Sequence, residues 1–131
     1  MDGLTLRRGT QEIILLNKFT LEHIVLPSVF TLSNGIRVVH QPMQRAVGHC
    51  GLMIACGSRD ELIHEHGLAH FIEHGMFKGT KKRNNTQILS RLDAVGGEIN
   101  AFTAKEETWI HASFLHTHTE RAIELIADIA L

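Results

Sequence analysis

One five-residue segment carries residues that could together bind a metal ion and activate water. His70, Glu73 and His74 occur in the pattern H-x-x-E-H. Residues four apart on an α-helix lie one turn apart on the same face, so His70 and His74 can offer two imidazole nitrogens to one cation. Glu73 falls on that face too, and its carboxylate can reach a water molecule held by the cation. Because a zinc hydrolase combines such nitrogen ligands with an open position for water and a nearby base, the segment predicts a zinc site.

Two alternatives apply to this short pattern, which chance also produces in unrelated chains. The first is a surface helix whose histidines are simply solvated. The second is a different ligand pair, because His66 lies one turn before His70. That pair has no carboxylate placed as Glu73 is, so we interpret His66 as a supporting or incidental residue. The other seven histidines show no comparable spacing.

Apolar residues around the motif predict how its helix is placed. Leu68, Ile72 and Met76 recur at four-residue spacing, with Phe71 beside them. On a helix over about residues 66–77, these side chains project away from the two histidines. We therefore expect an amphipathic helix with this apolar face in the core.

Composition limits the partners. The chain has 131 residues, 44% of them hydrophobic, which is ordinary for one globular domain or part of one. The net charge is −1, so nothing indicates nucleic acid or an anionic membrane. No apolar run could span a bilayer, and none resembles a secretion signal. We expect neither nucleic acid nor a membrane as a partner.

Two cysteines, Cys50 and Cys56, bear on the cellular compartment. They lie in a segment expected to be a strand, where six residues of extended chain separate them by about 20 Å. That distance is too long for a disulfide. We expect both to be buried, reduced thiols, which suits a cytoplasmic protein.

The remaining pattern predicts an α+β fold. Asn34-Gly35 separates residues 30–33 from 36–40 and indicates a β-hairpin. Alternating and apolar segments predict further strands over residues 46–56, 98–104 and 108–115. With the helices, the order indicates a two-layer sandwich of a largely antiparallel sheet with helices on one face.

Two more helices complete this sandwich. Asn84 and Asn85 are good N-caps for the first, and Gly96-Gly97 ends it. The expected buried residues of this first helix are Ile88, Leu89, Leu92 and Val95. Those of the last helix are Ala122, Ile123, Ile126, Ala127 and Ala130. The last helix has no stop signal before Leu131, which suggests part of a longer protein. Residues 1–28 form an unassigned N-terminal extension, and residues 29–131 form the incomplete domain.

Several segments in one order resemble a known family. They are LSNGIRV at 32–38, GSRDE at 57–61, GLAHFIEH at 67–74, FKGT at 77–80 and GGEINAFT at 96–103. Together they resemble the pitrilysin/insulinase family of zinc metallopeptidases, the inverzincin family that includes the mitochondrial processing peptidase. The resemblance covers about residues 30–131 and implies the truncated N-terminal part of such a metallopeptidase domain.

The resemblance implies roles for particular residues. His70 and His74 match the two histidine ligands of one Zn²⁺ ion, and Glu73 matches the general base. Asn100, Ala101 and Phe102 match an edge strand that pairs with the backbone of a peptide substrate; without the resemblance, an ordinary sheet edge would be the simpler interpretation. No residue here matches the family's third zinc ligand, a glutamate that lies farther along the chain.

The implied function is a zinc-dependent endopeptidase in which Glu73 activates a metal-bound water. Since the third ligand lies beyond residue 131, we expect this chain alone to be inactive. The implied partners are peptide substrates and a second half or subunit that forms a clamshell, and the chain itself is expected to self-associate. The main alternative is a non-catalytic structural or partner subunit of a heteromeric processing peptidase. A third interpretation is a hydrolase or lyase acting on other substrates, because fold does not fix the reaction.

Overall fold

A computed structural model describes residues 26–131 and divides the chain into two compact units, residues 1–43 and 44–131. Most of the unassigned N-terminal extension therefore lies outside the described residues. In the described part of the chain, no helix is both long and apolar enough to cross a bilayer.

A β-hairpin makes up the described part of the first unit. Its strands β1 (Ser28–Thr31) and β2 (Arg37–His40) are antiparallel. Gly35 in the turn has φ of 89°, a conformation that glycine adopts without steric cost. The side-chain oxygen of Asn34 accepts a hydrogen bond from the backbone N–H of Ile36. The predicted hairpin is confirmed, although its first strand begins two residues earlier than expected.

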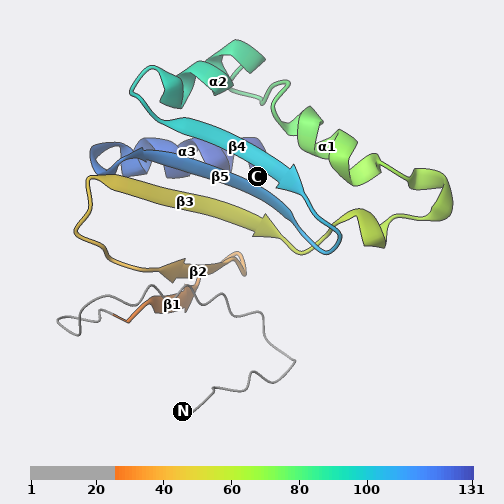
Figure 1. Cartoon of the computed structure of the whole chain (residues 1–131), viewed down its shortest axis with the longest axis horizontal. Helices are drawn as coiled ribbons and strands as arrows, with labels where there is room; N and C mark the ends of the chain where they lie inside the picture. Colours follow the sequence, from red (N-terminus) through yellow and green to blue (C-terminus); the bar gives the residue numbers. More distant parts are fainter. Residues whose placement is uncertain (1–25) are drawn as a thin grey trace, which may run out of the picture. The chain divides into compact units, whose positions relative to one another are not determined.

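The second unit contains a three-stranded antiparallel sheet (Figure 1). Its strands are β3 (Val47–Ile54), β4 (Glu98–Thr103) and β5 (Thr108–Leu115), in the order β3-β5-β4. All three predicted strands are confirmed. In this order β5 is central and β4 is at an edge.

Three helices accompany the sheet: α1 (Leu68–Met76), α2 (Asn85–Asp93) and α3 (Thr119–Ala130). Short 3₁₀ turns are η1 (Ser58–Asp60), η2 (Ile63–Glu65) and η3 (His116–His118). Asn84 caps α2 as predicted, because its side chain accepts a hydrogen bond from the backbone N–H of Gln87 and the Gln87 side chain returns one. Gly96, at φ of 73°, ends the segment in a left-handed conformation.

The hydrophobic core lies between one face of the sheet and the helices. α3 packs on β3 and β5, α2 packs on β4 and α3, and α1 contacts β4. The buried residues come from α2, β5 and α3: Ile88, Leu92, Ile110, Ala112, Phe114, Ala122, Leu125 and Ile126. The predicted two-layer α+β sandwich with helices on one face is therefore confirmed.

Two residues expected in this core are instead exposed. Leu89 is 47% exposed and Ile123 is 55% exposed. Each lies next to a buried apolar residue, Ile88 in α2 and Ala122 in α3. The apolar stripe in the sequence of each helix is therefore wider than the face that is buried. On α3, Leu125 takes a fully buried position that the sequence pattern did not assign.

The predicted core face of α1 is wrong. Leu68, Phe71 and Ile72 are 42%, 72% and 52% exposed, and of the expected set Met76 alone packs against the core. α1 contacts β4, the edge strand, and its buried residue Glu73 bonds to Thr103 at the end of that strand. Helical periodicity finds an apolar face, but position beside the sheet edge decides which face is buried.

The cysteines also depart in part from expectation. Cys50 is half-buried, and burial raises the pKa of its thiol to about 11, so it stays an inert thiol. Cys56 is exposed, because β3 ends at Ile54 and the chain turns away after it. Both are free, as predicted, but the prediction that both are buried is wrong for Cys56.

Candidate metal centre

The two motif histidines lie close enough to share one cation. Nε2 of His70 is 3.0 Å from Nε2 of His74, and the two rings meet edge to face with centroids 4.5 Å apart. Two nitrogens bound tetrahedrally to zinc at 2.0–2.1 Å would be about 3.3 Å apart. The pair therefore fits zinc with a small adjustment of the side chains.

Glu73 is the buried residue of the motif, at 7% exposure. Its Oε2 accepts a hydrogen bond from Oγ1 of Thr103 at 2.6 Å and lies 3.4 Å from Nδ1 of His70. A carboxylate beside Nδ1 favours the ring orientation and tautomer that leave Nε2 free for a metal. Thr103 is at the end of β4, so this contact joins the motif helix to the edge strand.

Sequence reasoning missed the part played by Thr103. It quoted this residue as the end of a matching segment and gave it no contact of its own. The available signal was the alternation along β4, which places Thr103 on the helix-facing side with Ile99 and Ala101. That alternation could not show which helix, or which residue, it would meet.

Sequence reasoning also missed Glu61, which fixes the start of α1. Its carboxylate accepts hydrogen bonds from the backbone N–H groups of Ala69 and Gly67, both at 2.9 Å. These two bonds, that of Ala69 first, hold the pKa of Glu61 below its ordinary value against the opposing effect of desolvation. The first N–H groups of a helix have no partner within it, so an acid at this end is stabilising.

His66 lies beside this acid. Its Nδ1 is 3.8 Å from Oε2 of Glu61, and its side chain is 73% exposed. The described contacts therefore associate His66 with the start of α1 and pair His70 with His74 instead.

A complete metal site is not formed by the described residues. Within residues 26–131, no three His, Cys, Asp or Glu side chains come together to hold a metal ion. The motif supplies two nitrogens, and catalytic zinc sites use three protein ligands.

The predicted substrate strand lies beside the motif helix. Asn100, Ala101 and Phe102 are in β4, which is an edge of the sheet in the described part of the chain. Asn100 and Phe102 are exposed on the sheet face away from the helices, where the Phe102 ring stacks on Trp109 with centroids 6.4 Å apart. Ala101 is half-buried on the opposite face.

Comparison with known proteins identifies the family of the chain. The family model described as "Insulinase (Peptidase family M16)" matches residues 37–131. A protein of Mycobacterium leprae named as an uncharacterised zinc protease is 47% identical over 103 residues, which are 77% of this chain and 23% of that protein. The mitochondrial-processing peptidase subunit beta of Bos taurus is 40% identical over 101 residues, covering 77% of this chain and 21% of that protein.

The fold is also similar to that of a solved structure. The crystal structure of a protease from Helicobacter pylori aligns with a TM-score of 0.75 at 28% identity, covering 79% of this chain and 25% of that protein. The chain thus spans about a quarter of the length of the relatives that it matches.

Proposed function

Because this chain belongs to the insulinase family of peptidases, M16, we propose that it carries the catalytic motif of a zinc-dependent endopeptidase. The observation that carries the proposal is the 3.0 Å separation of Nε2 of His70 and Nε2 of His74, which fits two ligands of one zinc ion. Relatives named as zinc proteases support zinc as the metal.

The proposed chemistry is hydrolysis of a peptide bond by water. A bound zinc ion would polarise the scissile carbonyl and acidify a water molecule. Glu73 is the general base in this proposal. Its Oε2 is engaged by Thr103, so we assign Oε1 as the atom that takes the proton from the attacking water.

Asn100, Ala101 and Phe102 are proposed to bind the substrate. An edge strand can pair with an extended peptide through main-chain hydrogen bonds, which depend little on the peptide's sequence. The contact between Thr103 and Glu73 supports this assignment, because it ties β4 directly to the proposed base. An ordinary sheet edge is the alternative interpretation of the same strand.

The chain alone is proposed to bind zinc weakly and to hydrolyse little. Two histidine ligands are one fewer than a catalytic zinc site needs, and the family resemblance implies a third ligand, a glutamate, beyond residue 131. A second half or subunit would complete the substrate chamber, and a relative named as a beta subunit supports this. Self-association through the open edge of β4, and a cytoplasmic location suited to two free thiols, are parts of the same proposal.

The competing candidate is a non-catalytic subunit. It is favoured by the incomplete ligand set of the described residues. The intact His70, Glu73 and His74 favour the peptidase, since a purely structural subunit has no need of a base next to two ligands.

Glu73→Gln in a longer protein that continues past Leu131 separates the two candidates. We expect this variant to keep its zinc, measured by metal analysis, and to lose hydrolysis of an unstructured peptide by at least about 100-fold. Glu120→Gln, at an exposed position in α3, is the matched control and should retain activity. Full activity in Glu73→Gln would rule out Glu73 as the base, and an inactive parent with tightly bound zinc would favour the non-catalytic subunit.

A further inference from the structure

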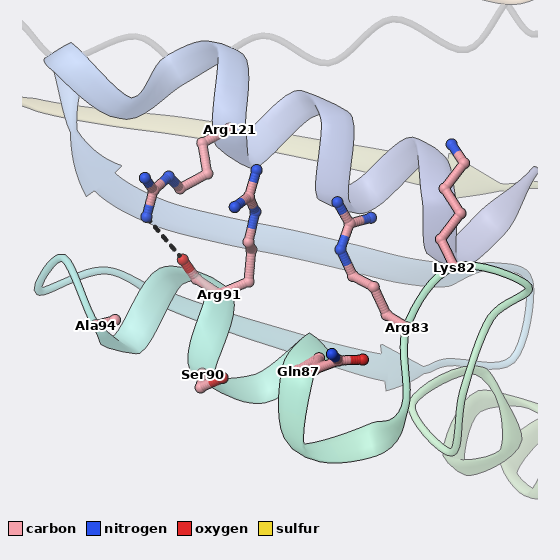
Figure 2. Close-up of a pocket in the computed structure, with 7 residues that line it drawn as sticks. All are labelled: Lys82, Arg83, Gln87, Ser90, Arg91, Ala94 and Arg121. Atoms are coloured by element: carbon pink, nitrogen blue, oxygen red, sulfur yellow. Dashed lines mark hydrogen bonds between the residues drawn. The ribbon is translucent and has the colours of Figure 1, made fainter.

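An open groove of about 390 Å³ lies between α2, α3 and the segment that precedes α2 (Figure 2). It is lined mainly by basic and polar side chains: Lys82, Arg83, Gln87, Ser90, Arg91, Ala94 and Arg121. None of the lining residues belongs to α1 or β4, so the groove is separate from the proposed zinc site.

Arg83 forms ion pairs with the two carboxylates near this groove. Its guanidinium donates to both carboxylate oxygens of Glu124, at 2.7 and 2.9 Å, and to Asp128. These hydrogen bonds, that with Glu124 first, raise the pKa of Arg83. Asp128 also accepts from Thr80 and lies 3.7 Å from Nζ of Lys82. This network joins the loop to α3 and accounts for Arg83 as a structural residue.

Two other guanidinium groups have no carboxylate of their own among the residues that the structure describes. Arg91 reaches Glu124 only at 3.6 Å, on an oxygen already bound by Arg83, and its buried Nε has no hydrogen-bond partner in the described part of the chain. Arg121 donates a long hydrogen bond, 3.4 Å, to the backbone carbonyl of Arg91. Figure 2 shows the Arg121 side chain extending from α3 toward the backbone of Arg91, and the Arg91 side chain extending from α2 toward α3.

The charges of the groove are therefore unbalanced. Among residues 26–131, four cations, counting Lys82 and Arg83, face two carboxylates, those of Glu124 and Asp128, which leaves two positive charges in excess. Like charges held together without an acceptor cost free energy, and a buried N–H without a partner adds to that cost. An anion held by the guanidinium groups of Arg91 and Arg121 would offset the excess positive charge.

We propose that this groove binds a phosphoryl group. A phosphate monoester carries a charge of about −1.5 to −2 at neutral pH, which matches the excess of two positive charges. Planar guanidinium groups present paired N–H donors that fit phosphate oxygens in a bidentate way. A single carboxylate would neutralise half of the excess. This site is independent of the proposed peptidase function, and either can fail without the other.

The test is a titration of the ¹⁵N-labelled 131-residue chain with sodium phosphate at pH 7.5, compared with sodium chloride at the same ionic strength. The Nε–Hε resonances of Arg91 and Arg121 report binding directly. We expect both to shift and to saturate with phosphate and to stay unchanged with chloride. Arg121→Gln should weaken binding by about tenfold or more, since a hydrogen bond to a charged group is lost.

Control variants keep the test decisive. Lys105→Gln removes the same charge from an exposed position in the turn between β4 and β5, and it should bind phosphate like the parent. Arg121→Lys keeps the charge without the planar donor pair and should bind with intermediate affinity. Amide spectra of each variant establish that the fold is retained.

Two further ligands identify the source of the phosphoryl group. Tighter binding of a phosphoserine peptide than of glucose 6-phosphate indicates a phosphoprotein, and the reverse order indicates a small metabolite. Shifts that do not saturate with phosphate, or equal affinity in Arg121→Gln and Lys105→Gln, would overturn the proposal and leave the groove as an internal ion-pair network.

Discussion

The hydrogen bond between Thr103 and Glu73 gives the sharpest prediction for this structure. Thr103→Val replaces a hydroxyl by a methyl of nearly the same size and keeps the β-branched shape that strands favour. The change therefore removes the 2.6 Å hydrogen bond to Oε2 of Glu73 and little else. Because the Glu73 side chain is 9% exposed, water cannot readily replace the lost donor.

The expected cost follows from these two facts. A hydrogen bond to a charged group contributes about 1.5–3 kcal/mol, so Thr103→Val should lower the free energy of unfolding by about 2 kcal/mol at pH 7. Thr103→Ser keeps the hydroxyl and loses one methyl from a half-buried position, which costs less than about 0.8 kcal/mol.

Urea denaturation of the 131-residue chain measures both changes. A double-mutant cycle with Glu73→Ala then isolates the interaction of the pair. The double variant should lose less unfolding free energy than the sum of the two single losses, by about 1.5 kcal/mol or more. Equal destabilisation by Thr103→Val and Thr103→Ser, or a coupling below about 0.5 kcal/mol, would refute the assignment of Thr103 as the residue that positions Glu73.

Three other predictions concern the elements around the site. Leu92→Ala should lower the free energy of unfolding by about 3 kcal/mol, because Leu92 is fully buried. Leu89→Ala, at a 47% exposed position one turn of α2 earlier, should lower it by less than about 1 kcal/mol in the same urea assay. Gly75→Ala should raise the unfolding free energy by about 0.5–1 kcal/mol, since a Cβ there has open space of 4 Å among residues 26–131 and α1 gains a better helix former. A lower denaturation midpoint would argue against this packing. Glu61 stabilises the fold at pH values above its unfolded pKa, because hydrogen bonds from the backbone N–H groups of Ala69 and Gly67 lower its pKa from 4.5. The stability advantage of the parent over Glu61→Gln should therefore be present at pH 7 and shrink as the pH falls below about 4.5, and a constant difference in unfolding midpoint across that range would contradict it.

Local signals predicted the elements that local chemistry determines. Asn34-Gly35 specified the hairpin, and Asn84 specified the start of α2 through a capping box that the structure contains. The alternation in residues 108–115 identified β5, whose every second side chain is buried. These features depend on a few neighbouring residues, so the sequence alone was sufficient.

Placement in three dimensions was harder to predict. The apolar residues of α1 indicated a core face, but Leu68 and Ile72 are exposed and Glu73 is buried. The contact of Glu73 with Thr103 joins residues 30 apart in the chain, and that of Arg83 with Glu124 joins residues 41 apart. Periodicity along one helix carries no information about which distant residue its polar side chains will meet.

Within the site, spacing predicted the pair and missed its supports. The i, i+4 rule brought together His70 and His74. Neither Thr103 nor Glu61 was assigned a part, because a hydroxyl at a strand end and an acid in a loop are common features without a recognisable spacing.

Zinc affinity tests the central claim most directly. It can be measured by competition with a chromophoric chelator, on this chain and on a longer protein that continues past Leu131. We predict weak binding by the 131-residue chain that is lost in His74→Ala and kept in His64→Ala, a control at a side chain 77% exposed. We also predict tight binding of one zinc ion by the longer protein. Equal zinc affinity in His74→Ala and His64→Ala, or tight one-to-one binding by the short chain, would contradict the account.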